Sequence, residues 1–317
     1  MPKAATAPKR RTTAPPPTQQ QTLDVDVSTD EFFTGLDEME DFANTVLYGR
    51  EGSGKSTAMS RLVNLRPTGK LLVINAEGGL KKIALRKRGV DVSRIVVWPK
   101  RGTPITYKGL IQVCNKIAAE LDDNPESWNG VGIDSATEVV QAILQHVQEK
   151  RVDSLRRQGK PVDENHIDIA DYGDMSKMFR DVLRKFRDLP CHVVITALER
   201  RDVDKDTGKP QYGPAVTPGL QADLLGYVDF VLMLKAGDED GPFRALTRAN
   251  SRYRAKDRFD VLPRVLAEPY LDRVVGYLHG DLIEEEDPFQ EDLPTRAKVS
   301  QDAVHDEDDE EDADQDE

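Results

Sequence analysis

The sequence predicts an α/β protein with a mostly parallel sheet and helices on both faces. Short apolar runs that end in polar residues recur along the chain, which is typical of strands buried on both faces of a sheet. Stretches with helical apolar spacing separate these runs, and strands that alternate with helices favour a doubly wound sheet. The expected strands are 46–48, 70–77, 94–98, 130–135, 191–197, 227–234 and 243–247.

The segments between these strands predict the helices and loops. Apolar residues recur at helical spacing in most of them, and two are polar throughout. The expected helices are a short amphipathic one over 31–42, then 58–65, 81–88, 110–121, 136–158 and 173–188. The polar segments 159–172 and 199–221 are expected to be loops.

The turn after the first strand, GREGSGKST, fits the phosphate-binding pattern G-x-x-x-x-G-K-[ST] in full. Its glycines allow successive backbone N–H groups to point at one anion, and the following helix adds its positive end. The pattern predicts that Lys55 reaches the β- and γ-phosphates of ATP and that the Ser56 hydroxyl binds Mg²⁺. An accidental glycine-rich turn is the alternative. The residues expected to hold the nucleotide are Gly49, Arg50, Glu51, Gly52, Ser53, Gly54, Lys55, Ser56 and Thr57.

Three further polar residues lie at or near strand ends, where ligands of such sheets bind. Asp134 is expected to help hold Mg²⁺, with capping of the next helix as the alternative. Glu77 is a candidate to orient and deprotonate the attacking water, or else a simple loop carboxylate. Thr196 either senses the γ-phosphate or is a satisfied hydroxyl at the end of its strand.

Charge is distributed unevenly over the 317 residues. The segment 281–317 has 18 acidic residues against Arg296 and Lys298, a net of −16, so residues 1–280 carry about +3 of the total −13. A near-neutral body with basic clusters is compatible with a nucleic-acid partner. The expected organisation is a disordered tail over 1–30, rich in Pro and Gln, an ATPase domain over 31–283, and a disordered acidic tail over 284–317.

The two cysteines, Cys114 and Cys191, lie in apolar segments and are expected to be buried thiols in a reducing compartment. No apolar run is long enough to span a bilayer, and the amino terminus lacks a signal-peptide core. The sequence therefore predicts a cytoplasmic protein that does not enter a membrane.

In the order of its blocks the chain resembles the RecA family of recombination ATPases. The similar blocks are GREGSGKST, LLVINAEGGLKKIALRKRGV, GVGIDSA and MFRDVLRKFRDLPCHVVITA, and the likeness extends over about residues 44–260. The resemblance implies a RecA-like core in which Glu77 is the catalytic glutamate and Asp134 the magnesium aspartate. The loops 159–172 and 199–221 fall where the family has its DNA-binding loops. The family's adenine-stacking tyrosine falls on Ala84 here, and its γ-phosphate-sensing glutamine falls near Ala197.

A closer likeness is to compact RecA-like ATPases of bacteriophages that act in single-strand annealing (Sak-type). The shared features are the short core, the Tyr212-Gly213-Pro214 block and an Ala-Lys-Asp-Arg block at 255–258. In RadA-like relatives a related block reaches the nucleotide of the next subunit. The resemblance implies this role for Lys256 and Arg258, with a solvated basic turn as the alternative. If the protein is phage-encoded, its expected location is the cytoplasm of the host cell.

The polar loop over 199–221 is the candidate for contact with single-stranded DNA. Its cations neutralise phosphates and its tyrosine stacks on a base, although DKDTGK also reads as a solvated hairpin turn. The candidate residues are Arg200, Arg201, Lys205, Lys209 and Tyr212. The acidic tail is expected to compete with DNA for this surface or to recruit a basic partner, or else only to improve solubility.

The resulting hypothesis is an ATPase that uses Mg²⁺ and acts on single-stranded DNA in phage recombination, annealing or replication. A homo-oligomer and a single-strand-binding protein are its expected partners. The alternatives are a nucleotide-switched binding module without significant hydrolysis, a P-loop kinase, and a helicase loader.

Overall fold

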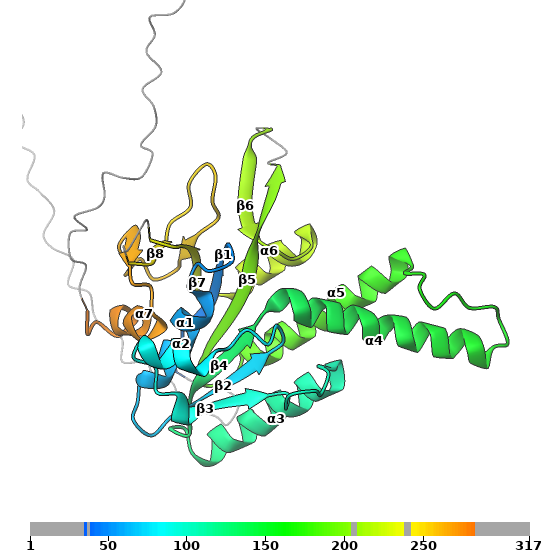
Figure 1. The fold of residues 1–317 in the computed structure, drawn as a ribbon, viewed down its shortest axis with the longest axis horizontal. Coiled ribbons are helices and arrows are strands. Elements are labelled where there is room, and N and C mark those ends of the chain that lie inside the picture. The colour runs from blue at the N-terminus through cyan, green and yellow to red at the C-terminus, as the bar shows by residue number, and fades with distance from the viewer. Residues whose placement is uncertain (1–34, 37–38, 204–207, 238–241, 283–317) are drawn as a thin grey trace, which may run out of the picture. The chain divides into compact units, whose positions relative to one another are not determined.

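The computed structural model describes residues 35–36, 39–203, 208–237 and 242–282 (Figure 1). By its contacts the chain divides into two units, Met1–Asp41 and Phe42–Glu317, and every strand and helix described below lies in the second. The predicted tails over 1–30 and 284–317 and the candidate Lys205 lie outside the described residues. The division into three regions therefore stays a prediction.

The sheet is mostly parallel, as predicted. Its strand order is β10-β8-β7-β1-β5-β4-β2-β3, with β6 attached to β5 and β9 attached to β7. The parallel strands are β1 (Asn44–Gly49), β2 (Lys70–Asn75), β3 (Ile95–Trp98), β4 (Trp128–Asp134), β5 (His192–Val203) and β7 (Phe230–Lys235). The antiparallel strands are β6 (Pro210–Pro214), β8 (Arg244–Leu246), β9 (Lys256–Asp257) and β10 (Val265–Ala267).

Helices cover both faces of the sheet, which confirms the α/β prediction. One buried apolar cluster joins one face to α3 (Tyr107–Asp123), α4 (Ala136–Arg157), α5 (Ile169–Arg187) and α6 (Pro218–Tyr227). A second cluster joins the other face to α1 (Lys55–Ser60), η2 (Arg61–Asn64), α2 (Lys82–Lys87) and α7 (Leu271–Leu278). The short turn η3 (Val92–Arg94) precedes β3.

The position of β5 determines how the strand ends meet. β5 lies between β1 and β4, with Leu47 opposite Thr196 and Ile133 opposite Ile195. The carboxyl end of β4 is therefore separated from the strand that precedes the glycine-rich turn by one intervening strand. As a consequence, Thr196 of β5 lies beside Asp134 at the end of β4, and its Oγ1 donates to Asp134 Oδ1.

Several predicted boundaries are wrong for local reasons. The helix predicted from 173 begins at Ile169, because Asp168 and Asp171 form a reciprocal capping box in what reads as a polar loop. The strand predicted to end at 197 continues to Val203, since it pairs with β6 in an antiparallel hairpin.

The start of the sheet also differs from the prediction. Residues 40–43 have no helical structure, because Ala43 already hydrogen-bonds β5 through its N–H and its carbonyl. The helix expected over 31–42 is therefore wrong at this end. Residues 31–34 and 37–38 lie outside the described residues. Near the other end, α6 occupies 218–227, where the sequence predicted a loop and then a strand from 227. The helix α7 and the strand β10 were not predicted at all.

Gly130 in β4 lies so close to the neighbouring strand β5 that no side chain fits there. A Cβ atom there would lie 2.3 Å from the backbone oxygen of His192. Gly130→Ala is expected to lower the free energy of unfolding by about 1–3 kcal/mol, because the neighbouring strand must move. The control is Gly173→Ala in α5, where a Cβ meets nothing within 4 Å; it should raise stability by up to about 1 kcal/mol. Urea denaturation of both variants tests this, and equal stabilities would contradict it.

His192 is buried at the start of β5, where its Nδ1 accepts a hydrogen bond from the Ala43 N–H at 2.9 Å. Burial, with the nearby charges of His279 and Arg66, lowers the pKa of His192 to about 3. Below the ordinary value of 6.5 the unfolded chain therefore binds a proton that the folded chain does not. As pH decreases below 6.5, this group alone should therefore lower the free energy of unfolding by about 1.4 kcal/mol per pH unit.

The variant His192→Asn keeps an acceptor near the Nδ1 position and cannot titrate. Between pH 6.5 and 5.0 the wild type should lose about 2 kcal/mol of unfolding free energy more than this variant does. Urea denaturation at the two pH values measures the difference. Parallel losses in the two proteins would show that His192 is protonated in the folded state.

Candidate nucleotide-binding site

The glycine-rich turn joins β1 to α1 at the carboxyl edge of the sheet (Figure 1). Gly54 has φ 88°, and a Cβ there would lie 3.1 Å from the Phe243 ring. A side chain is therefore disfavoured both by the backbone and by the neighbour. The Lys55 ammonium folds back over the turn and donates to the carbonyls of Gly49 at 2.9 Å and Arg50 at 2.8 Å.

The Lys55 side chain lies among carboxylates. Burial lowers the pKa of Lys55 below its ordinary value, while the charges of Glu77 and Asp134, followed by Glu51 and Glu199, act to raise it. Glu51 belongs to the turn itself, whereas Glu77 follows β2, Asp134 ends β4 and Glu199 lies in β5, so segments distant in sequence surround one ammonium.

Asp134 is the centre of a hydroxyl–carboxylate cluster. The residue is 2% exposed; its Oδ2 accepts from Ser56 Oγ at 2.9 Å, and its Oδ1 accepts from Thr196 Oγ1. The structure thus brings the two predicted metal residues together, and Asp134 does not cap α4 through its side chain. Thr196 is fully buried beneath Asp134. In this structure the hydroxyl is used by Asp134, which fits the alternative of a satisfied strand-end hydroxyl. The sensing role of Thr196 stays a prediction.

The donor set fits Mg²⁺. Mg²⁺ in phosphoryl-transfer sites takes one or two carboxylates together with substrate phosphates and waters. Ser56 and Asp134 supply one hydroxyl and one carboxylate, and among the described residues no group of three or more His, Cys, Asp or Glu side chains forms an all-protein metal cage. The residues present thus match a metal that arrives with its nucleotide.

Glu77 lies two residues beyond the end of β2, with its side chain exposed. Its Oε1 accepts a hydrogen bond from Ser135 Oγ, and its backbone N–H donates to the Asp134 carbonyl at 3.1 Å. Glu77 is therefore tied through two contacts to the strand end that carries Asp134. Its carboxylate is fixed beside the cluster and remains open to solvent, as an acceptor of a water proton must be.

A family model described as an AAA domain matches residues 41–259, more than two thirds of the chain. The chain belongs to this AAA domain family. The matched residues include the glycine-rich turn, Glu77, Asp134 and Thr196. No curated protein matches the chain.

Two solved structures are similar to this AAA domain protein. The RadB recombinase shares 18% identity and a TM-score of 0.40, over 68% of this chain and 84% of that one. An ATPase of the type III secretion system of pathogenic bacteria shares 13% identity and a TM-score of 0.34, over 61% of this chain and 52% of that one.

The remaining residues of the turn in the AAA domain are positioned differently. Glu51 is exposed and Thr57 half-buried. Arg50 is 82% exposed, and its Nε lies 3.7 Å from Glu199 Oε1 at the end of the parallel part of β5. The Ser53 hydroxyl is buried without a hydrogen-bond partner in the structure. Sequence reasoning missed Glu199 and Ser135 as residues of the site. Their positions near Thr196 and Asp134 at the same two strand ends could have indicated that they belong to it.

Lys256 and Arg258 of the AAA domain have partners within the chain. Lys256 Nζ donates to the carbonyls of Leu225 at 3.2 Å and Val228 at 2.7 Å, at the end of α6. Burial and the Arg258 charge lower the pKa of Lys256. Within the chain Lys256 thus stabilises a helix carboxyl end, and its role at a neighbour's nucleotide stays a prediction. Arg258 pairs with Asp229 at 2.7 Å and is 51% exposed, so its role between subunits stays a prediction.

Of the predicted DNA-contact residues, Arg200, Arg201 and Tyr212 lie on the paired strands β5 and β6, which rise beyond the other strands in Figure 1. Arg201 is directly opposite Tyr212, whereas Arg200 donates to the Val216 carbonyl at 3.2 Å. The Tyr212 ring is 5.3 Å from that of Tyr253. Lys209 lies just before β6 and is exposed. The hairpin turn itself lies outside the described residues.

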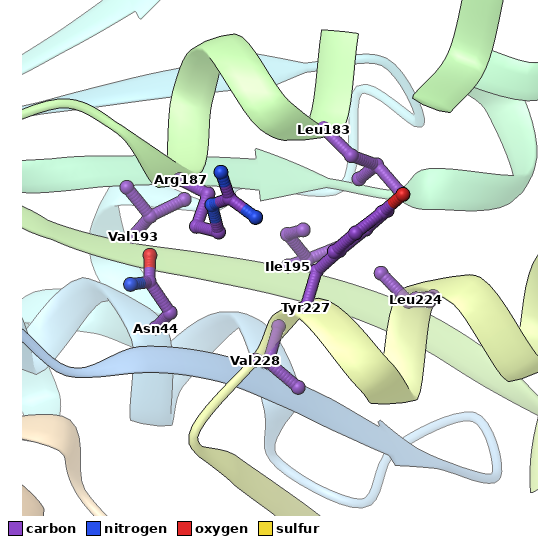
Figure 2. Close-up of a pocket in the computed structure, with 8 residues that line it drawn as sticks. All are labelled: Asn44, Leu183, Arg187, Val193, Ile195, Leu224, Tyr227 and Val228. Atoms are coloured by element: carbon purple, nitrogen blue, oxygen red, sulfur yellow. The ribbon is translucent and has the colours of Figure 1, made fainter. Parts of the chain in front are cut away.

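The small cavity in Figure 2 lies elsewhere in the AAA domain. It has a volume of about 10 Å³ and is enclosed by side chains of β1, β5, α5 and α6, among them Asn44, Arg187 and Tyr227. A space of this size admits about one water molecule, so it is no ligand site.

Burial raises the pKa of Cys114 to about 11 and that of Cys191 to about 12, as expected for unreactive thiols. No helix in the described ranges has the length and apolar character of a bilayer crossing.

Proposed function

We propose that this AAA domain protein is a RecA-like ATPase that binds ATP with Mg²⁺, hydrolyses it, and acts on single-stranded DNA in phage recombination, annealing or replication. The observation that carries the proposal is the convergence of Lys55, Ser56, Asp134 and Glu77 at one edge of the sheet. These residues come from three separate strand ends, and each has the chemistry that one part of ATP hydrolysis needs.

In the proposed reaction the backbone N–H groups of the turn and the Lys55 ammonium bind the phosphates of ATP. Ser56 and Asp134 would hold Mg²⁺, which neutralises charge on the β- and γ-phosphates when bound. Glu77 accepts a proton from the attacking water, and Ser135 keeps that carboxylate oriented. Thr196 acts through Asp134 by fixing the carboxylate plane.

Contact with DNA is proposed for the exposed face of the β5–β6 hairpin. Tyr212 and Tyr253 form an aromatic pair, and the Arg252 guanidinium lies 5.7 Å and 5.9 Å from their ring centroids. Paired aromatic and guanidinium surfaces suit stacking with unpaired bases. The Tyr48 hydroxyl donates to the Arg254 carbonyl at 2.6 Å and approaches the Tyr212 carbonyl at 3.3 Å. Because Tyr48 precedes the glycine-rich turn, this contact joins the hairpin to the nucleotide site.

The nucleotide-switched module is the second candidate, and the Tyr48 contact is the observation that favours it. It would transmit nucleotide binding to the hairpin with no need for hydrolysis. A kinase or a helicase loader shares the phosphate site and differs in its acceptor or partner. A homo-oligomer and a single-strand-binding protein are proposed partners.

ATP turnover with and without oligothymidine, over a salt series, tests the proposal. Oligothymidine should stimulate turnover, and the log of its binding constant should fall by about 0.7 per phosphate contact per decade of salt. Arg201→Ala should reduce this slope by about one contact, whereas Arg86→Ala on α2 should leave it unchanged. ATP turnover that is the same with and without DNA would contradict the DNA-dependent function and would not affect the proposed nucleotide site.

A further inference from the structure

A second pocket lies beside the nucleotide site, between α4 and the connection from β3 to α3. Its volume is about 400 Å³, within the range of small-molecule sites. The floor is formed by Asn75 and Ala76 at the end of β2. The connection over 99–105 forms one wall, and the outer face of α4 forms the other.

The chemistry of this pocket is that of a neutral, hydrogen-bonding ligand. Gln141, Gln145 and Gln148 follow one another along one face of α4 at spacings of four and three residues. Gln145 Nε2 donates to Glu149, and Gln148 Nε2 donates to the Glu164 carbonyl, so each carboxamide keeps a further donor and acceptor capacity. Apolar walls flank this row of amides; they are Pro99, Pro104, Ile105, Leu144 and Ile167.

The pocket interior and its rim differ in charge. The residues that line it include one carboxylate, Glu138, and no Lys or Arg, so a phosphate is not favoured inside. Lys100 and Arg101 are exposed on the same connection that forms the wall, in a turn closed by a hydrogen bond from Thr103 N–H to the Lys100 carbonyl at 2.9 Å. Cations therefore lie beside the pocket while amides line it.

We propose that this pocket binds one unstacked base of a single-stranded nucleic acid, whose backbone phosphates contact Lys100 and Arg101. Carboxamides match the donor and acceptor pairs on base edges, and apolar walls accept the faces of a base removed from its stack. A free anion fits the rim but not the interior, and an apolar ligand would leave the amides unpaired. The inference rests on the proposed action on single-stranded DNA and adds a base-binding site outside the β5–β6 hairpin.

The floor of the pocket connects it to catalysis. Ala76 N–H donates to the Asp134 carbonyl at 2.7 Å, and the next residue is Glu77. Asn75 Oδ1 is buried without a hydrogen-bond partner in the structure. A base that contacts this floor touches the segment that positions Glu77, which gives nucleic acid a direct route to the hydrolysis step.

The test compares binding of fluorescent oligothymidine with binding of an abasic oligonucleotide of equal length. Gln141→Leu removes one amide, and Ala142→Phe fills the pocket. Each should weaken oligothymidine binding roughly fivefold or more, since a bound base contributes on that scale, and leave the abasic strand unaffected. Lys100→Ala with Arg101→Ala should weaken both ligands. Gln112→Leu, an exposed glutamine on α3 outside the pocket, should change neither.

Binding of ADP is measured on the same samples, together with circular dichroism to show that each variant is folded. If the wild type binds oligothymidine and both pocket variants bind it equally well, the pocket proposal is overturned while the ATPase proposal stands. Equal losses for oligothymidine and the abasic strand would also overturn it, because the pocket would then act on the backbone. If the wild type binds ADP but no oligonucleotide, the pocket and the DNA function fall together and the nucleotide site remains.

Discussion

Replacing Glu77 with glutamine is expected to reduce ATP turnover by about 10²–10⁴-fold, the usual contribution of a positioned general base. Glutamine has nearly the same shape and can still accept the hydrogen bond from Ser135 Oγ. It cannot take a proton from water. Because Glu77 is also one of the charges around Lys55, its loss leaves that ammonium more available to phosphate, and nucleotide binding should be retained. Single-turnover phosphate release and binding of a fluorescent ATP analogue measure the two effects separately.

Three variants define the controls for this experiment. Glu126→Gln removes an exposed carboxylate before the amino end of β4, the opposite end of that strand from Asp134, and should leave turnover nearly unchanged. Ser135→Ala keeps the base but loses its orientation, so its loss should be intermediate. Lys55→Met should abolish nucleotide binding itself. Unchanged turnover in Glu77→Gln, with hydrolysis present in the wild type, would identify another base; absence of hydrolysis in both would favour the switch module.

The parts of the fold that the sequence predicts are those with a local signal. The buried strands β2 and β4 read as unbroken apolar runs, and the glycine-rich turn fits a fixed pattern. Since parallel strands direct their carboxyl ends to one edge, the meeting of Glu77 and Asp134 near Lys55 follows from order alone. Ser135 and Glu199 were missed because a residue type at a strand end does not reveal which neighbour it contacts.

The parts that could not be predicted depend on contacts between distant segments. Nothing local states that β5 inserts between β1 and β4, and this insertion buries Thr196 under Asp134. The basic block at Lys256 reads as an exposed turn, yet its ammonium is used by the end of α6, a helix that the sequence did not reveal. The capping box of α5 is visible in the sequence as Asp168 and Asp171. The polar composition of 159–172 nevertheless led to the prediction of a loop there.

Asp134→Asn is expected to raise the Mg²⁺ concentration needed for half-maximal turnover by roughly a hundredfold or more, since a metal ligand of this kind supplies several kcal/mol of charge stabilisation. Ser56 and Thr196 donate to its two oxygens, and either hydroxyl can turn to accept from an asparagine N–H. The fold should therefore survive, and removal of a buried charge should leave the metal-free protein at least as stable.

The matched controls for Asp134→Asn separate charge from orientation. Thr196→Val leaves the carboxylate charged and removes one donor, so its Mg²⁺ midpoint should shift by about 10–100-fold, the usual effect of a residue that orients a ligand. Asp123→Asn at the exposed end of α3 should shift nothing. Nucleotide binding in the presence of a chelator should be retained in all three variants, because Lys55 and the turn are intact. A Mg²⁺ titration of Asp134→Asn that overlays the wild type would exclude Asp134 as a metal residue, and its burial between two hydroxyls would then be a packing feature of β4 alone.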